Sequence, residues 1–177
     1  MVLYYLTHVR LMKHLLLTTI AAVVLVGCGH TSFKIGHPSP QSRAEILDLI
    51  SKYSYFWDNR SAEKWADLFL DNATWSHYLD GVFAKSFGSR NERLSFANEK
   101  HKSFTELGIQ TRHHQTNTLL KRNPDGSIRG DTIFSVIWQH AEESAPKLIH
   151  SGIYRDIFVK TPTGWKFKSR EIHVDHK

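Results

Sequence analysis

The sequence predicts one α+β domain, in which N-terminal helices are packed against a strongly curved antiparallel sheet that encloses a pocket. Apolar residues recur mostly at helical spacing up to residue 107, and long strand-like segments occupy residues 110–174. Helices followed by a meander of strands are typical of an α+β domain. A curved sheet wrapped over helices leaves a cavity between the two layers.

Three helices are predicted, at residues 42–59, 61–70 and 89–107. Ser42 with Glu45, and Ser89 with Glu92, have the spacing of capping boxes at the starts of the first and third helices. Asp58 lies in the last turn of the first helix, at the edge of its apolar face. Because the negative end of the helix dipole disfavours a carboxylate there, Asp58 needs either solvent or a partner.

Six strands are predicted, at residues 73–79, 82–87, 110–122, 127–141, 147–161 and 163–174. Residues Asp80 and Gly81 suit a tight turn between the first two strands. The turn residues at 123–126 and 161–164, both of which contain proline and glycine, separate the long strands. We therefore expect hairpin connections through most of the sheet.

The N-terminus predicts export from the cell. A basic start precedes an apolar run over residues 15–27, which is too short to span a bilayer. Cys28, the only cysteine, follows this run directly and resembles the acylated cysteine of the bacterial lipoprotein lipobox. An ordinary signal peptide followed by a chance cysteine is the alternative. Met1 and Met12 are both possible start residues.

This resemblance divides the chain into a signal peptide (residues 1–27), a flexible tether (28–41) that begins at lipidated Cys28, and a domain (42–177). Acylation of Cys28, by palmitate for example, would anchor the domain to a membrane and leave it without a free thiol. Gly29 in place of aspartate implies outer-membrane sorting. We expect a protein of the bacterial cell envelope that faces the periplasm, although the sequence does not fix the membrane face.

Composition argues against several classes of function. The formal net charge is +6, and it falls to +4 if the signal that holds Arg10 and Lys13 is removed. No dense Lys/Arg cluster indicates a nucleic-acid surface, so no nucleic-acid partner is expected. The twelve histidines form no HExxH pattern, and no phosphate-binding or dinucleotide motif is present. We expect neither a metal nor a cofactor.

Segments along the whole domain resemble the SnoaL-like domains of the nuclear-transport-factor-2-like (NTF2-like) superfamily. They are residues 50–58, 65–69, 71–73, 111–117, 152–156 and 164–170. The resemblance implies an NTF2-like cone with an apolar pocket. It is greatest to the branch that includes scytalone dehydratase, bile-acid dehydratase and a dehydrochlorinase. Because this fold hosts enzymes and non-enzymes alike, the resemblance says more about fold than about function.

The resemblance implies a catalytic pair formed by Asp58 and His113. A histidine can remove a proton near neutral pH if a carboxylate fixes its tautomer and stabilises the imidazolium. On a regular strand, His113 shares one face with Gln115 and Asn117, whereas His114 lies on the other face. A register shift of one residue would exchange the two histidines. Whether the pair is catalytic or only structural stays open.

Other residues are candidates for contact with a substrate. They are Tyr53, Trp57, Trp75, His77, Asn117 and Tyr154. Tyr53 is also a natural core residue, and either His77 or Tyr78 would have to serve as the proton donor. Asp156 is expected to pair with Arg170 as a structural bridge.

Three functions remain at this stage. The first is a cofactor-independent lyase or isomerase, of the dehydratase type, that acts on a small hydrophobic molecule. The second is non-catalytic binding of a small apolar ligand. The third is an envelope interaction module that forms a homodimer through the outer face of its sheet.

Overall fold

A computed structural model describes residues 36–175. The predicted signal peptide, Cys28 and most of the predicted tether lie outside the described residues. Among the residues described, no helix is both long enough and apolar enough to cross a membrane.

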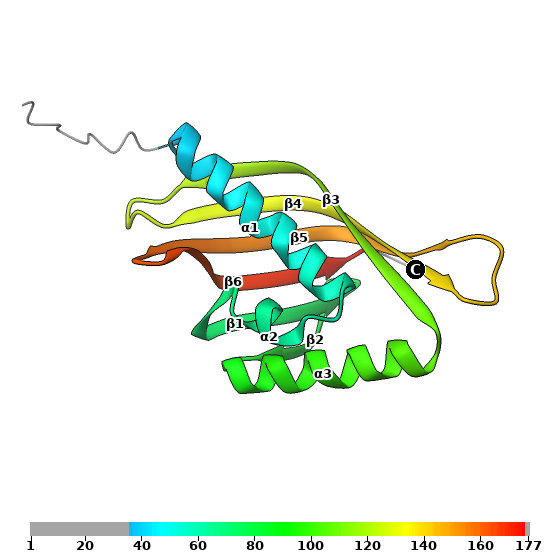
Figure 1. Cartoon of the computed structure of the whole chain (residues 1–177). Helices are drawn as coiled ribbons and strands as arrows, with labels where there is room; N and C mark the ends of the chain where they lie inside the picture. Colours follow the sequence, from blue (N-terminus) through cyan, green and yellow to red (C-terminus); the bar gives the residue numbers. More distant parts are fainter. Residues whose placement is uncertain (1–35, 176–177) are drawn as a thin grey trace, which may run out of the picture. The chain divides into compact units, whose positions relative to one another are not determined.

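The predicted α+β class is confirmed, because helices lie against one curved sheet (Figure 1). The elements are α1 (Pro40–Asp58), α2 (Ala62–Ala66), β1 (Phe69–Leu79), β2 (Val82–Phe87), α3 (Arg90–Glu106), β3 (Ile109–Arg122), β4 (Ile128–His140), β5 (Lys147–Thr161) and β6 (Gly164–Val174). The strand order is β2-β1-β6-β5-β4-β3, so β2 and β3 are the edges. Helix α1 crosses the sheet and contacts β3 and β6, whereas α3 contacts β1 and β3.

The sheet is mixed and not purely antiparallel as predicted. Strand β1 pairs with β6 in parallel, and the other four neighbouring pairs are antiparallel. A parallel pair needs a long connection between its strands, and here α3 and four further strands lie between β1 and β6. The local turn signals of the sequence carry no information on this distant pairing.

The predicted cap of the first helix is wrong by three residues. Helix α1 begins at Pro40, and the Ser39 side chain accepts a hydrogen bond from the Ser42 backbone N–H at 3.1 Å. Proline is favoured in the first helical turn because its φ is already helical and its missing N–H has no partner to lose there. The helix therefore extends into the predicted tether. The second predicted capping box is confirmed, because Ser89 and Glu92 bond reciprocally.

The boundary between α2 and β1 also differs from the prediction. Helix α2 ends at Ala66, and the segment from Phe69 that was expected to finish a helix belongs to a strand. Phe69 pairs with Phe167 of β6, and their rings stack at a centroid distance of 4.9 Å. This contact between residues far apart in the sequence overrides the local helical pattern.

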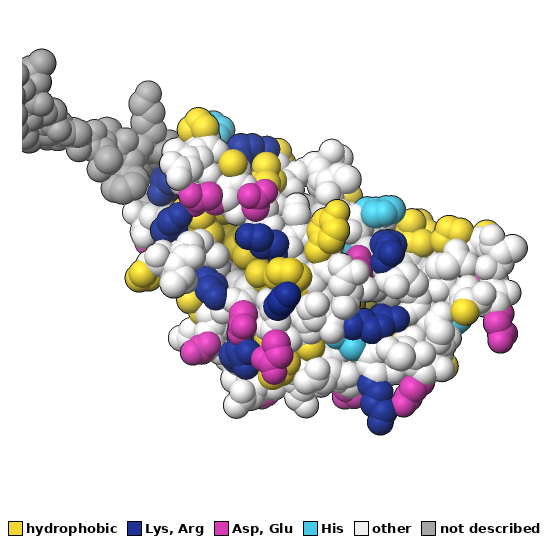
Figure 2. Space-filling view, in the orientation of Figure 1, with side chains coloured by type: hydrophobic (Ala, Val, Ile, Leu, Met, Phe, Trp, Pro, Cys, Tyr) yellow, Lys and Arg dark blue, Asp and Glu magenta, His cyan; other side chains and the backbone are white. Residues whose placement is uncertain are grey.

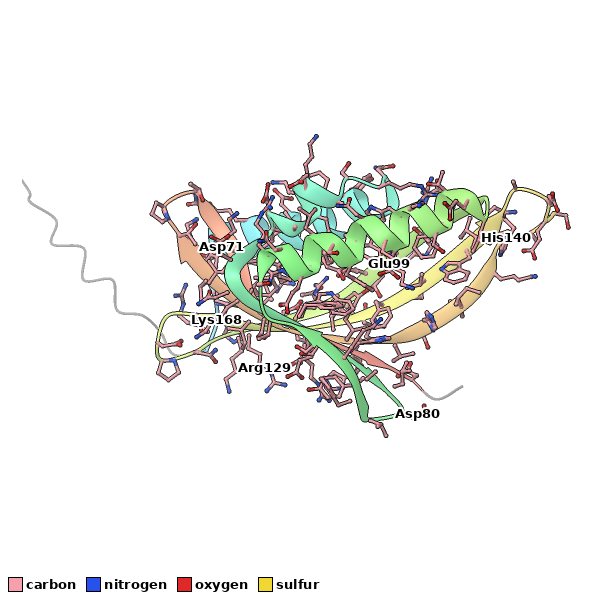
Figure 3. All side chains as sticks on the ribbon, turned by 90° about the horizontal axis from the view of Figure 1, so that it is seen from below. Asp71, Asp80, Glu99, Arg129, His140 and Lys168 are labelled. Carbon is pink, nitrogen blue, oxygen red and sulfur yellow. The ribbon has the colours of Figure 1, made fainter. Side chains whose placement is uncertain are left out.

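Aromatic rings fill the interior between α1 and the middle of the sheet. The Tyr53 ring lies within 6.2 Å, centroid to centroid, of four others, which belong to Trp65, Phe69, Tyr154 and Phe167. Side chains crowd the space between the sheet and α3, the helix that carries Glu99 (Figure 3). This part of the predicted pocket is thus solid core.

The predicted bridge between Asp156 and Arg170 is present within that core. Nε and Nη2 of Arg170 donate to the two carboxylate oxygens of Asp156, each at 2.8 Å, and both side chains are 0% exposed. The guanidinium also lies 4.0 Å from the centre of the Tyr53 ring and 4.1 Å from that of Tyr154. Burial raises the pKa of Asp156, and the nearby Arg170 charge opposes this shift.

Candidate active site

Asp58 and His113 are in direct contact, although they are 55 residues apart. His113 Nδ1 lies 2.7 Å from Asp58 Oδ1, and the same oxygen accepts a hydrogen bond from Thr111 Oγ1 at 2.7 Å. The other oxygen, Oδ2, accepts the His113 backbone N–H at 2.8 Å. The start of β3 therefore supplies the partners that a buried carboxylate at the end of α1 requires.

These contacts determine which nitrogen of His113 is available. An ionised Asp58 only accepts hydrogen bonds, so we assign the imidazole proton to Nδ1 and a lone pair to Nε2. Among the described residues, no hydrogen bond occupies Nε2. His114 is exposed, so His113 is the histidine that faces inward, as predicted. The arrangement suits proton removal by Nε2 while Asp58 holds the ring.

The pair borders a cleft between the end of α1 and the start of β3. This cleft has a volume of about 280 Å³ and is lined by Ser54, Tyr55, Asp58, Asn59, Arg112, His113 and His114. A second cavity of about 410 Å³ shares four of these residues and continues along β3 to Thr118. Together they form a groove along the seam between α1 and the edge strand β3.

Four of the predicted substrate-contact residues lie in the core, namely Tyr53, Trp57, Trp75 and Tyr154. The Tyr53 hydroxyl accepts a hydrogen bond from Trp75 Nε1 at 3.2 Å, and both side chains are buried. Tyr154 is buried and stacks on Phe134 at 4.1 Å. Burial raises the pKa of both tyrosines. None of the four lines the groove beside His113.

The prediction that Asn117 shares a face with His113 is wrong. A bulge interrupts the pairing of β3 with β4 between Thr116 and Leu119, and Asn117 has a φ of +52° there. Asn117 is consequently exposed, because the bulge ends the regular alternation of faces. Gln115 does lie inward, and its Nε2 donates to Ser54 Oγ at 2.6 Å.

Of the two candidates for the donor, Tyr78 belongs to the outer face of the sheet. Its ring stacks on that of His173 at 4.5 Å. His77 is half-buried and is the direct cross-strand partner of Lys85. Burial, followed by the charges of Lys85 and His150, lowers the pKa of His77 to about 4. His77 is therefore neutral at pH 7.

Trp57 connects the pair to a residue that the sequence analysis missed. The Trp57 ring lies 6.3 Å from the ring of His113 and 4.9 Å from that of His101 on α3. His101 is 5% exposed, and neither of its ring nitrogens has a hydrogen-bond partner. Burial, followed by the Arg60 charge, lowers its pKa to about 4.

Arg60 is the second residue that was missed. Its Nη2 donates to the backbone oxygen of Ile109 at 2.6 Å, where β3 begins, but its Nη1 is buried without a partner. Spacing on α3 gave a usable signal for His101, because Arg93, Ala97 and His101 recur every four residues on the buried face. No sequence pattern marks Arg60. Among the described residues, no three His, Cys, Asp or Glu side chains are grouped to hold a metal.

The sequence profile of the SnoaL-like domain matches residues 39–171, three quarters of the chain. The chain belongs to the SnoaL-like family. This confirms the predicted SnoaL-like and NTF2-like character of the domain. No protein in the curated set matches the sequence.

Several solved structures have the same fold as this chain. ActVI-ORFA from Streptomyces coelicolor is 24% identical, covers 76% of this chain and 96% of its own, and gives a TM-score of 0.66. Aln2 from a Streptomyces species is 20% identical, the match covers 78% of this chain and 94% of Aln2, and the TM-score is 0.67. A putative scytalone dehydratase from Novosphingobium aromaticivorans is 24% identical, the match covers 76% of this chain and 85% of that protein, and the TM-score is 0.59. At these identities the likeness shows the fold alone.

Proposed function

We propose that this SnoaL-like protein is a cofactor-independent lyase or isomerase that removes a proton from a small hydrophobic molecule. His113 Nε2 is the base, and Asp58 is the residue that positions it. The observation that carries this proposal is the 2.7 Å contact between His113 Nδ1 and Asp58 Oδ1, beside an open cleft. The family to which the chain belongs includes cofactor-independent isomerases and dehydratases, which supports the same reaction type.

The network around Asp58 favours chemistry over a purely structural contact. Thr111 Oγ1 and the His113 backbone N–H each donate to one of the two carboxylate oxygens, so the carboxylate stays in place when the imidazole takes up a proton. The imidazolium then forms beside a fixed negative charge, which stabilises it. A positioned general base of this kind contributes about 10²–10⁴-fold to a rate.

Proton exchange tests this proposal without knowledge of the natural substrate. We would incubate the protein with 2-tetralone in D₂O and follow loss of the C1 proton signal by NMR. The base takes a C1 proton, the C–H electron pair forms the C1=C2 bond, and the carbonyl π electrons move to oxygen. Reversal of these steps with a deuteron completes the exchange.

We expect His113→Gln to slow the exchange by about 100-fold. The histidine control is His37→Gln, which changes an exposed residue before α1. It should retain the wild-type rate. A wild-type rate equal to that of His113→Gln would contradict the proposal and favour a pocket that only binds its ligand.

An apolar band on the outer face of the sheet supports homodimer formation as a second role. Cross-strand pairing aligns one residue from each strand, in the order Thr116, Ile133, Ile153, His173, Tyr78 and Phe83. Ile133, Ile153 and Phe83 are 47%, 37% and 56% exposed.

Ile153→Glu should convert a dimer to monomers in sedimentation experiments. A wild-type protein that is monomeric at about 100 μM would contradict this role.

The envelope location is a further part of the proposal. Gly36 forms an antiparallel bridge with Arg122, so the chain enters the domain beside the end of the edge strand β3. We propose that Cys28 carries the lipid that anchors the protein to the outer membrane. Cys28→Ser should move the protein from the membrane fraction to the soluble periplasmic fraction. Unchanged fractionation, together with no lipid mass at Cys28, would contradict lipidation.

A further inference from the structure

Basic side chains gather at one end of the domain, which we call the basic end. It contains the β3–β4 turn, the β5–β6 turn and the start of α1 (Figure 1). The basic residues there are Arg43, Lys121, Arg122, Arg129, Lys160, Lys166 and Lys168. The acids there are Glu45, Asp125 and Asp131. With seven basic residues against three acids, the basic end has a formal net charge of +4.

The opposite end of the domain is acidic. Glu106, Glu142 and Glu143 line a cavity of about 560 Å³ between the end of α3 and the β4–β5 turn. In Figure 3, Arg129 and Lys168 lie at one end of the sheet and His140 lies at the other. Charge is thus separated along the strands. No run of the sequence shows this separation, because each end is assembled from several segments.

Only part of the positive charge at the basic end is neutralised within the domain. Lys160 pairs with Glu45, and Arg129 pairs with Asp131. The exposed basic residues that form no ion pair among the described residues are Arg43, Lys121 and Lys168. A cleft of about 460 Å³ also opens at this end, and its lining includes Arg122 and Lys160. Lys and Arg side chains are the usual partners of phosphate groups.

The chain enters the domain at the basic end, where Gly36 bridges to Arg122. Seven residues separate Cys28 from Gly36, and this segment spans at most about 28 Å when extended. Strand β5, with 15 residues, is about 50 Å long. A lipid on Cys28 therefore keeps the basic end, and not the acidic end, close to a membrane surface.

We propose that the basic end docks on anionic phospholipid headgroups, with a headgroup phosphate in the cleft between Arg122 and Lys160. The inference rests on the proposed lipidation of Cys28 and deepens it by naming the surface and the class of lipid. Each Lys or Arg near an anionic membrane strengthens association by about fivefold. Salt screens this attraction, so the Cys28→Ser protein still leaves the membrane at physiological ionic strength.

Docking in this orientation also determines where the substrate enters. Asp58 ends α1, about 27 Å along the helix from Pro40 at the basic end. The cleft beside His113 is therefore held away from the headgroups, and it takes up its substrate from the aqueous side.

Vesicle binding tests the docking without any lipid on the protein. We would titrate the full chain carrying Cys28→Ser with vesicles of phosphatidylcholine, with or without phosphatidylglycerol, at low ionic strength. Phosphatidylglycerol should strengthen binding by about tenfold or more, and added salt should reverse the gain. The apolar run at residues 15–27 is the same in every variant, so differences between variants report on the domain.

Two exposed lysines provide a matched pair of variants. Lys121→Glu at the basic end and Lys102→Glu on α3 change the net charge equally. Lys121→Glu should weaken binding to phosphatidylglycerol vesicles by about tenfold, and Lys102→Glu by less than about twofold. Equal losses would show that net charge determines binding, which would overturn the docking surface.

A single label at either end tests the orientation directly. Because Cys28 is the only cysteine, the Cys28→Ser chain can carry one fluorophore on Thr163→Cys in the β5–β6 turn or on Ser144→Cys in the β4–β5 turn. Brominated phosphatidylglycerol should quench the label at residue 163 and leave the label at residue 144 bright. Equal quenching would contradict the orientation.

The outcomes separate docking from lipidation. Binding that depends on phosphatidylglycerol, without lipid mass at Cys28, would retain the basic end as a docking surface and reject the anchor. Lipid mass at Cys28 without such dependence would retain the anchor and overturn the docking. Salt-sensitive self-association that Lys121→Glu abolishes, without vesicle binding, would also overturn it and assign the basic end to the acidic end of a second copy.

Discussion

The domain contains two buried pairs of an acid and a nitrogen base, and they differ in whether a cleft reaches them. Arg170 uses two nitrogens on Asp156, three aromatic rings cover its guanidinium, and neither side chain is exposed. Asp58 and His113 share one side-chain contact, their side chains are 8% and 10% exposed, and His113 keeps one ring nitrogen without a partner among the described residues. Because both of its partners are fully buried, the Asp156–Arg170 pair is structural. The Asp58–His113 pair keeps His113 Nε2 free beside a cleft, which suits it to proton removal.

The largest expected effect comes from breaking the Asp156–Arg170 pair. Asp156→Leu leaves a guanidinium without its counter-ion in the core, and we expect the free energy of unfolding to fall by about 3–5 kcal/mol. Urea titration measures this loss. The double variant Asp156→Leu/Arg170→Met should recover much of it, because no unpaired charge remains. If the double variant is less stable than the single one, the pair does not behave as a structural ion pair.

A smaller effect on stability, but a large one on rate, is expected for Asp58→Asn. The amide no longer fixes the Nδ1–H tautomer or stabilises the imidazolium, so tetralone exchange should fall about 100-fold. The matched control is Asp131→Asn, which removes a carboxylate paired with Arg129 on the outer face. An exchange rate for Asp58→Asn within threefold of wild type, about 0.6 kcal/mol, would make this pair structural too.

The unpaired His101 should make stability depend on pH. Its pKa is about 4 in the folded protein, against about 6.5 when unfolded, so the unfolded chain binds the proton first as pH falls. The stabilisation is complete above pH 6.5 and is lost progressively between pH 6.5 and pH 4. Over this range wild type should lose about 2 kcal/mol more than His101→Met.

Comparison with His101→Met isolates this contribution, since His77 titrates over the same range in both proteins. Urea titrations at pH 7 and pH 4.5 measure the difference. Parallel stability curves for the two proteins would show that His101 is hydrated and titrates normally.

The smallest effect should come from Thr111→Val. This change removes one hydrogen bond to Asp58 but keeps the shape of the buried side chain. We expect a loss of about 1 kcal/mol in the free energy of unfolding and a modest fall in exchange rate, because the His113 backbone still holds the carboxylate. A rate loss as large as that of Asp58→Asn would show that Thr111, and not Asp58, determines the position of the base.

The parts of the fold that depend on residues close together in the sequence could be predicted. The apolar stripe of α1 placed Asp58 at the edge of the core. Alternation along β3 put His113 and His114 on opposite faces, and the family resemblance chose His113 as the inward one. The predicted face of Asn117 was wrong because β3 contains a bulge, and alternation of side chains along a strand does not reveal a bulge. The start of β1 was also predicted wrongly, because Phe69 is held in the strand by its pairing with Phe167, almost a hundred residues later.

The site was less predictable than the fold. The Asp58–His113 contact followed from a family resemblance, but Tyr53, Trp75 and Tyr154 belong to the core because their rings pack on one another. Which nitrogens of His101 and Arg60 are buried without a partner depends on how three elements pack together. The surface in Figure 2 gives no direct pointer either, since positive, negative and hydrophobic side chains are interspersed on that face.

The position of β6 has a consequence for folding. This strand lies between β1 and β5, and it alone joins the β1–β2 hairpin, whose tip carries Asp80, to the other strands (Figure 3). Without the eleven residues of β6, the sheet would be in two separate pieces. Contacts that span so much sequence form slowly. The pairing of β6 with β1 is therefore the slow step that makes one sheet out of two.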